Sequence, residues 1–169
     1  MGFLYQRLNY GARSGRFISE SGVERVPRGR FQVVEFQRIR YADLNARQQE
    51  NYNCQKLAAK LADYGFICIR LSDDWQGADL IACHLDGKTS LRIQLKGRYC
   101  VDQKYRGKDL YIGFRDDEDW YVYPHDDVLN QVLSSNRLVG TKSWDELGCY
   151  SFPGLSKQDK DLLEQYRLP

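Results

Sequence analysis

A short turn between two stretches of strand character constrains the fold of this chain more than any other feature. The pair Asp86-Gly87 favours a tight β-turn, and it separates residues 78–84 from residues 90–96, which both have strand-like composition. Antiparallel pairing across such a turn decides which side chains lie opposite one another. The sequence therefore predicts a β-hairpin within a larger sheet.

The segments around this hairpin predict helices and further strands. Residues 45–64 carry apolar side chains at three- and four-residue steps, the spacing of one helix face, and Gly65 is suited to end that helix. Other expected elements are strands over residues 66–71, 110–114 and 120–123, and helices over residues 124–133 and after Ser156. The expected fold class is α/β or α+β, with a mixed β-sheet of about five strands flanked by helices.

The composition is that of an ordinary globular protein. The chain has 169 residues, of which 42% are hydrophobic and 28% charged, and this length suits one domain. The sequence has neither an apolar run of membrane length nor a secretory signal, so we expect a cytoplasmic protein. The five cysteines form no CxxC pair and their number is odd, which argues against a disulfide framework and against a zinc site.

The beginning of the chain is basic and has little hydrophobic periodicity. Residues 1–40 contain eight arginines against three glutamates. We expect residues 1–35 to form a poorly ordered extension and residues 36–169 to form a single folded domain. A basic arm of this kind is compatible with a polyanionic partner such as a nucleic acid.

The second strand of the hairpin carries the residues of greatest chemical interest. Along residues 91–96 the apolar side chains fall on one face of the strand, and Arg92, Gln94 and Lys96 fall on the other. Gln94 and Lys96 therefore project side by side, about 7 Å apart. Asp79 begins the neighbouring strand, so pairing across the hairpin can bring its carboxylate next to Gln94. A carboxylate, an amide oxygen and an ammonium group would then meet at one edge of the sheet.

This grouping suits the hydrolysis of phosphodiester bonds. Mg²⁺ prefers oxygen ligands and usually keeps several waters, and Mn²⁺ is expected to substitute for it. Asp79 would supply the charged ligand, Gln94 a neutral side-chain oxygen and Leu95 its backbone carbonyl. Lys96 would hold the attacking water and stabilise the charge that develops on the phosphate.

The order of these residues resembles the PD-(D/E)xK nuclease signature. Gly77-Ala-Asp79, a hairpin and then Ile93-Gln-Leu-Lys96 are similar to that motif, in the Gln-x-Lys form found in Mrr-like restriction endonucleases. The resemblance covers roughly residues 45–125. It implies a restriction endonuclease-like core and a Mg²⁺-dependent endonuclease that acts on DNA rather than RNA. Ala78 stands where the family usually has proline, and Gln94 replaces a carboxylate, which predicts weaker metal binding.

The resemblance also implies a glutamate on the first helix near the metal, and Glu50 is the candidate. It lies on the helix stripe that carries Cys54 and Leu57, so it should face the sheet. The alternative is a solvated glutamate in the first turn, favoured there by the helix dipole. Asp73 and Asp74, in the turn before Asp79, could line the same site.

A basic stretch follows the predicted hairpin and suits the phosphate backbone of a nucleic acid. We expect residues 97–108 to be mobile, with Tyr99 and Tyr105 able to stack on bases. The alternative is a solvated loop without a ligand. The candidate nucleic-acid contacts are Arg92, Arg98, Lys104, Arg106 and Lys108.

Two other functions are compatible with the same residues. One is a catalytically inactive nucleic-acid-binding module that retains the nuclease fold. The other is a structural protein in which Asp79 and Lys96 form an ion pair. For an active enzyme, cleavage of both DNA strands needs two centres, which makes a homodimer plausible.

Overall fold

Six strands form the main sheet of residues 35–168, the part of the chain that the computed structural model describes. In order across the sheet they are β1 (Phe66–Trp75), β2 (Ala78–His84), β3 (Ser90–Leu95), β5 (Tyr111–Asp116), β6 (Asp119–Pro124) and β8 (Arg167–Leu168). Strands β3 and β5 run parallel, and the other neighbours run antiparallel. The expected α+β class with a mixed sheet is therefore confirmed.

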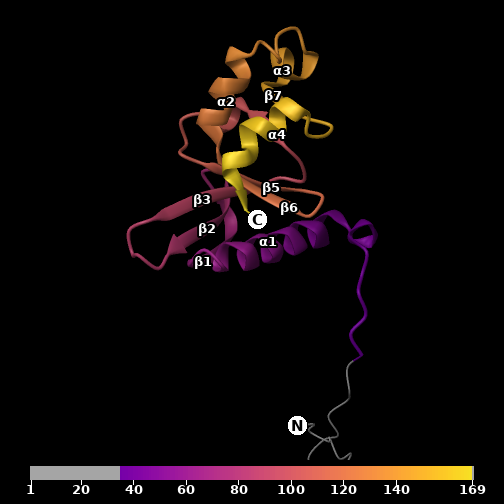
Figure 1. Ribbon diagram of the computed structural model, residues 1–169, viewed down its shortest axis with the longest axis vertical. Helices are drawn as coiled ribbons and strands as arrows, with labels where there is room; N and C mark the ends of the chain where they lie inside the picture. The colour runs from indigo at the N-terminus through magenta and orange to yellow at the C-terminus, as the bar shows by residue number, and fades with distance from the viewer. Residues whose placement is uncertain (1–34, 169) are drawn as a thin grey trace, which may run out of the picture. The chain divides into compact units, whose positions relative to one another are not determined.

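Helix α1 (Ala46–Ala62) covers one face of this sheet (Figure 1). It begins with a capping box, in which the Asn45 side chain accepts a hydrogen bond from the Gln48 backbone and the Gln48 side chain accepts one from the Asn45 backbone. Leu57 is fully buried with apolar side chains of β2 and β3. Gly113 lets the helix approach β5 closely, because a Cβ atom there would lie 2.7 Å from the Leu57 side chain.

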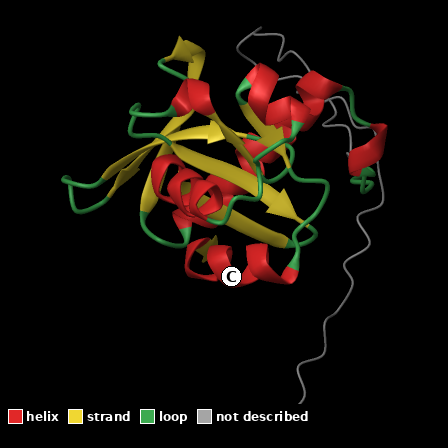
Figure 2. Cartoon of the chain, turned by 90° about the horizontal axis from the view of Figure 1, so that it is seen from above, coloured by secondary structure: helices red, strands yellow, loops and turns green. Residues whose placement is uncertain are grey.

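The opposite face carries a second hydrophobic core. Figure 2 shows how the helices surround the strands. Strand alternation in β5 explains the division, since Ile112 and Phe114 belong to this core while Tyr111 packs on the side of α1. The elements on or beside this face are α2 (His125–Ser134), α3 (Lys142–Leu147), α4 (Lys157–Leu163), and a small sheet of β4 (Cys100–Asp102) and β7 (Cys149–Ser151). Three 3-10 helices, η1 (Tyr41–Asp43), η2 (Gln103–Tyr105) and η3 (Glu164–Tyr166), complete the described part.

The predicted hairpin is present between β2 and β3. Leu80 pairs with Ile93, and Gly87 adopts a left-handed conformation with φ of 70°. The backbone N–H groups of Thr89 and Lys88 donate to Asp86 Oδ1 at 2.8 and 2.7 Å. They hold the pKa of this carboxyl well below its usual range.

The prediction of a mobile loop over residues 97–108 is wrong. This segment contains β4 and η2, and Tyr99 and Tyr105 are only 2% and 4% exposed. Tyr99 stacks on Phe152 with ring centroids 4.3 Å apart, and Val101 pairs with Tyr150 of β7. These two tyrosines are buried side chains and are not available for stacking on bases.

The chain divides into two compact units, and the second, Ile39–Pro169, contains every helix and strand of the described part. Of the first unit, residues 35–38 are described, and they have no regular structure. The predicted extension over residues 1–35 lies, apart from Glu35, outside the described residues. Within residues 35–168, no helix combines the length and the apolar character needed to cross a membrane.

Candidate active site

A bulge in β1 opens the edge of the sheet at Asp79. The pairing of β1 with β2 passes from Arg70 opposite Leu80 directly to Trp75 opposite Ala78. Residues 71–74 therefore lie opposite Asp79 alone. Bulges bend a strand and interrupt its hydrogen bonding, and they are frequent beside functional sites.

The bulge forms one wall of a pocket of about 550 Å³. Helix α1 forms another wall, and the start of β2 and the end of β3 form its base. The lining residues are Ala46, Arg47, Glu50, Arg70, Leu71, Ser72, Asp73, Asp79 and Gln94. Asp73 lines the pocket, while the side chain of Asp74 lies outside the described part of the structure.

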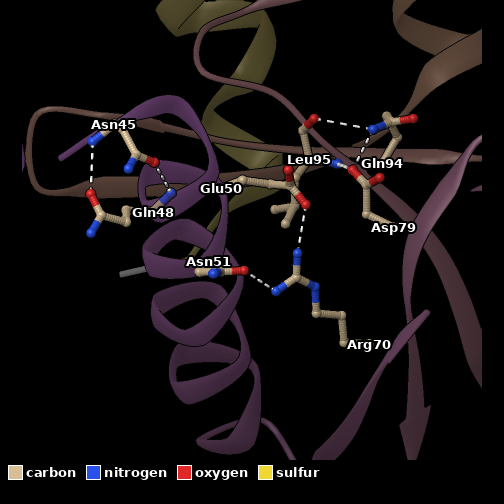
Figure 3. Close-up of polar contacts among 8 residues, drawn as sticks. All are labelled: Asn45, Gln48, Glu50, Asn51, Arg70, Asp79, Gln94 and Leu95. Atoms are coloured by element: carbon tan, nitrogen blue, oxygen red, sulfur yellow. Dashed lines mark hydrogen bonds and ion pairs between the residues drawn. The ribbon is translucent and has the colours of Figure 1, made fainter. Parts of the chain in front are cut away.

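Asp79 and Gln94, which line the pocket, form a small hydrogen-bonded group with Leu95 (Figure 3). The backbone N–H of Leu95 donates to Asp79 Oδ2 at 2.7 Å. Gln94 Nε2 donates to the same carboxylate oxygen and also to the Leu95 carbonyl, the latter at 3.2 Å. The three residues singled out as a ligand set are therefore in direct contact, and they are half-buried or buried.

Glu50 reaches the pocket from α1 and has an ionic partner there. Its Oε1 atom lies 2.6 Å from Arg70 Nη2, and Arg70 also donates to the Asn51 side chain (Figure 3). The two charged side chains are 51% and 44% exposed, so water screens this pair and it adds little to stability. Glu50 therefore reaches Arg70 on β1 and is at the same time exposed to solvent, so it has features of both alternatives.

Sequence reasoning missed Arg70. It places a guanidinium group in the pocket, adjacent to the strand that carries Asp79. The sequence could have predicted its position, because side chains alternate between the two faces of a strand. Phe66, Cys68 and Arg70 therefore share the face of β1 that packs against α1. An arginine on a face next to a helix stripe that carries Glu50 predicts this pair.

Lys96 lies near this group but not on the lining of the pocket. Its Nζ atom is 5.0 Å from the centroid of the Tyr105 ring, and Lys104 Nζ is 4.9 Å from the same centroid. The Tyr105 hydroxyl donates to Gln94 Oε1 at 3.1 Å. Tyr105 thus connects Gln94 with Lys96, a role that the sequence did not suggest.

The thiols near the site favour the protonated form. Burial raises the pKa of Cys54, with Arg70 lowering it and the carboxylates of Asp79 and Glu50 raising it further. Burial also raises the pKa of Cys100 to about 11, although Lys96 lowers it.

The donor atoms around Asp79 suit a hard cation. The oxygens are the carboxylates of Asp79 and Glu50 and the carbonyl of Leu95. The Gln94 amide presents its nitrogen to Asp79 and its oxygen to the Tyr105 hydroxyl. Within residues 35–168, no three His, Cys, Asp or Glu side chains cluster as a metal site. Two carboxylates and a carbonyl would suit Mg²⁺ only with waters as its further ligands.

The candidate nucleic-acid contacts have different surroundings. Arg92 donates to Gln76 Oε1, to the Lys108 carbonyl and to Asp109 Oδ2 at 3.0, 2.7 and 3.1 Å, so it ties the β1–β2 turn to a loop. Lys104 pairs with Asp102 at 3.1 Å and keeps 60% of its side chain exposed. Of the others, Arg98 and Arg106 are exposed and Lys108 is half-buried.

Comparison with known proteins gives partial structural likenesses. The Holliday junction resolvase Hjc of Archaeoglobus fulgidus matches with 21% identity and a TM-score of 0.36, over 44% of this chain and 70% of the resolvase. The bacterial homing endonuclease I-Ssp6803I matches with 21% identity and a TM-score of 0.39, over 50% of this chain and 69% of the endonuclease. No protein-family model and no curated protein matches the chain. Likenesses at this level describe partial overlap of folds, so function has to be inferred from the chain's own residues.

Proposed function

We propose that this protein is a metal-dependent endonuclease of the PD-(D/E)xK type, a hydrolase that cuts phosphodiester bonds in DNA. The observation that supports this most is the hydrogen-bonded contact among Asp79, Gln94 and the Leu95 backbone, in which Asp79 and Gln94 line an open pocket. A second carboxylate, Glu50, and a guanidinium group, Arg70, line the same pocket. Oxygen donors for a cation and a positive group for a phosphate are thus within one cavity.

The chemistry of each side chain suggests its role in the reaction. Bound Mg²⁺, or Mn²⁺ in its place, would supply positive charge at the scissile phosphate. Asp79, Gln94 and Leu95 would hold that cation, with Glu50 as a further oxygen donor. The guanidinium of Arg70 suits a non-bridging phosphate oxygen, because it offers several N–H donors in one plane.

Lys96 is the proposed activating cation. Its contact with the Tyr105 ring keeps the ammonium close to Gln94 without neutralising it, because an aromatic face attracts a cation but carries no net charge. From there the flexible side chain can orient the attacking water and stabilise charge on the phosphate. Removal of such a group typically costs a factor of about 10² to 10³ in rate.

The substrate is proposed from charge. Arg98, Lys104 and Arg106 offer exposed positive groups on the segment that follows β3, and Arg92 and Lys108 stand beside them. Contacts of this kind to the phosphate backbone give binding that weakens steeply with salt. Cleavage of both DNA strands would need a second centre, which a homodimer would supply.

The test is cleavage of supercoiled plasmid and of single-stranded DNA by the full chain with Mg²⁺, Mn²⁺ or EDTA. Wild type should nick the plasmid in either metal and not in EDTA, and Lys96→Ala should lose about a hundredfold or more of that rate. Lys157→Ala, an exposed lysine at the start of α4, is the matched control and should cut normally. Activity retained in Lys96→Ala or in EDTA would refute the proposal.

A second candidate function is a catalytically inactive module that binds nucleic acid. One observation favours it: Gln94 replaces a carboxylate, and its amide nitrogen, not its oxygen, faces Asp79. Such a module should bind DNA in a salt-sensitive manner and should show neither cleavage nor stabilisation by divalent cations.

A further inference from the structure

The orientation of the Gln94 amide depends on what lies between Asp79 and Leu95. Gln94 Nε2 donates to both Asp79 Oδ2 and the Leu95 carbonyl. Both partners are acceptors, so chemistry requires the NH₂ end of the amide on that side when no cation is present. A cation held by the same two oxygens requires the opposite, because only the amide oxygen can bind it. Gln94 cannot satisfy both conditions in one orientation.

Tyr105 lies at the other end of the same amide. Its hydroxyl donates to Gln94 Oε1 at 3.1 Å. A phenol hydroxyl can donate or accept, so it can pair with either end of an amide. It is therefore a partner that suits both orientations of Gln94.

The Tyr105 ring is held in place from several directions. It is 4% exposed, and the His125 ring packs edge-on against it with centroids 5.7 Å apart. Gly77 lies so close that a Cβ atom there would be 3.1 Å from the ring. The ammonium groups of Lys96 and Lys104 lie within about 5 Å of its centroid. The hydroxyl therefore has a fixed position relative to Gln94.

We propose that Gln94 is a cation-coupled amide switch and that Tyr105 is the positioning residue that pairs with it in both states. When a divalent cation enters between Asp79 Oδ2 and the Leu95 carbonyl, the amide turns by half a turn about its last side-chain bond. Oε1 then faces the cation, and Nε2 donates to the Tyr105 hydroxyl, which changes from donor to acceptor. This inference rests on the divalent cation of the proposed function.

The switch explains what a glutamine offers at a position where a carboxylate would bind the cation more strongly. A glutamate would repel Asp79 whenever the cation was absent. The amide instead donates a hydrogen bond to Asp79 in that state. The cost is that cation binding must break this bond, and the second partner, Tyr105, offsets that cost.

The first experiment follows the wild-type full chain by nuclear magnetic resonance with added Mg²⁺. The side-chain NH₂ protons of Gln94 should show contacts to the Leu95 backbone without Mg²⁺, and contacts to the Tyr105 ring protons with saturating Mg²⁺. If Mg²⁺ shifts the Asp79 signals while the Gln94 NH₂ protons keep their contacts, the switch is wrong and the metal site stands. If the folded protein binds neither Mg²⁺ nor Mn²⁺, both the switch and the proposed metal dependence are wrong.

The second experiment measures Mn²⁺ affinity by titration calorimetry. Tyr105→Phe keeps the ring but leaves the rotated NH₂ without an acceptor, and a buried orphan N–H is worse tolerated than a carbonyl oxygen with an open lone pair. We expect Mn²⁺ to bind about threefold to tenfold more weakly. Tyr99→Phe, which removes another buried hydroxyl away from the pocket, is the control and should bind Mn²⁺ as wild type does.

The Gln94→Glu variant separates positioning from packing. A carboxylate needs no rotation, and it accepts from the Tyr105 hydroxyl with or without the cation. Tyr105→Phe should therefore have little effect on Mn²⁺ affinity when combined with Gln94→Glu. An equal loss in both backgrounds would mean that Tyr105 supports only the packing of the site.

Discussion

Two halves of the described domain differ in how exposed their side chains are. The hairpin half, formed by α1 and β1 to β3, contains the bulge, the open pocket and exposed apolar side chains such as Ile67 and Ile69, which are 61% and 55% exposed. The aromatic half, formed by β4 to β7, α2 and α4, contains stacked rings around Tyr99 and Phe114. The aromatic half is built for packing, and the hairpin half presents hydrogen-bonded polar side chains to an open pocket.

Tyr105 joins these halves. Its ring belongs to the core of the aromatic half, while its hydroxyl bonds to Gln94 of the hairpin half. A polar group is positioned best when a rigid neighbour holds it, because little conformational entropy is then lost on binding. The difference between the halves therefore predicts that substitutions in the aromatic half change stability and that substitutions in the hairpin half change activity.

The largest expected effect is on stability, from Asp159→Ala in the aromatic half. Asp159 is 1% exposed and accepts two hydrogen bonds from Arg137, at 2.7 and 3.0 Å. Removal of one partner of a buried ion pair costs about 3 to 5 kcal/mol, and the partial exposure of Arg137 favours the lower value. Urea unfolding followed by circular dichroism measures it, and the surface variant Asp161→Ala should stay within about 0.5 kcal/mol of wild type.

The same residue makes stability depend on pH. Burial raises the pKa of Asp159, but hydrogen bonds from Arg137 and Ser156 outweigh it and the pKa is lowered overall. Asp159 therefore contributes fully to stability when the pH is above its pKa in the unfolded protein, about 4. The contribution is lost as the pH falls from there toward its lower pKa in the folded protein. Wild type should lose more stability than Asp159→Asn between about pH 5 and pH 3. Parallel losses in both proteins would show that Asp159 does not carry this dependence.

The next effect is on activity, from Asp79→Asn in the hairpin half. Asparagine keeps an oxygen that accepts from the Leu95 N–H but removes the charge proposed to hold the cation. Plasmid nicking should fall by about a hundredfold or more, while unfolding in urea changes by about 1 kcal/mol or less. Full activity in this variant would remove Asp79 from the catalytic centre, and a large loss of stability would remove the contrast between the halves.

Local patterns in the sequence predicted the parts of the fold whose partners are close along the chain. The turn at Asp86-Gly87 and the start of the helix after Ser156 depend on residues close along the chain, so the local sequence was sufficient to predict them. The register of the hairpin then placed Asp79 next to Gln94. The strand over residues 66–71 was also expected, but its continuation to Trp75 was not.

The features of the fold and the site that were not predicted depend on contacts between segments far apart in the sequence. Strand β4 forms because Val101 pairs with Tyr150 of β7, and a strand of three residues has no periodicity to detect. The bulge in β1 appears only when the register on both sides of it is known. The bond from Tyr105 to Gln94 likewise depends on how η2 packs against the sheet, which the basic character of residues 97–108 concealed.

A smaller effect is expected for nucleic-acid binding, from Trp75→Ala. Trp75 is 61% exposed at the end of the bulge, and the following Gln76 is fixed by its bond to Arg92. Stacking of a base on such an aromatic side chain contributes about 1 to 3 kcal/mol. Fluorescence anisotropy with single-stranded DNA should show about tenfold weaker binding, whereas Tyr64→Ala, at the far end of α1, should bind normally. Equal affinities for both variants would place the DNA elsewhere.

The smallest effect is expected from Tyr99→Phe in the aromatic half. The Tyr99 hydroxyl is buried without a hydrogen-bond partner among the described residues, and burial raises the pKa of this phenol well above its usual range. An unpaired buried hydroxyl costs free energy in the folded state, so its removal should leave stability unchanged or raise it by up to about 1 kcal/mol. Thermal unfolding measures the change, with Tyr123→Phe for comparison. The Tyr123 hydroxyl donates to the Cys100 carbonyl, so its removal should lower stability. If Tyr99→Phe destabilises the protein as much as Tyr123→Phe does, then the Tyr99 hydroxyl has a partner such as buried water. The aromatic half would then contain a polar group as well satisfied as those of the hairpin half.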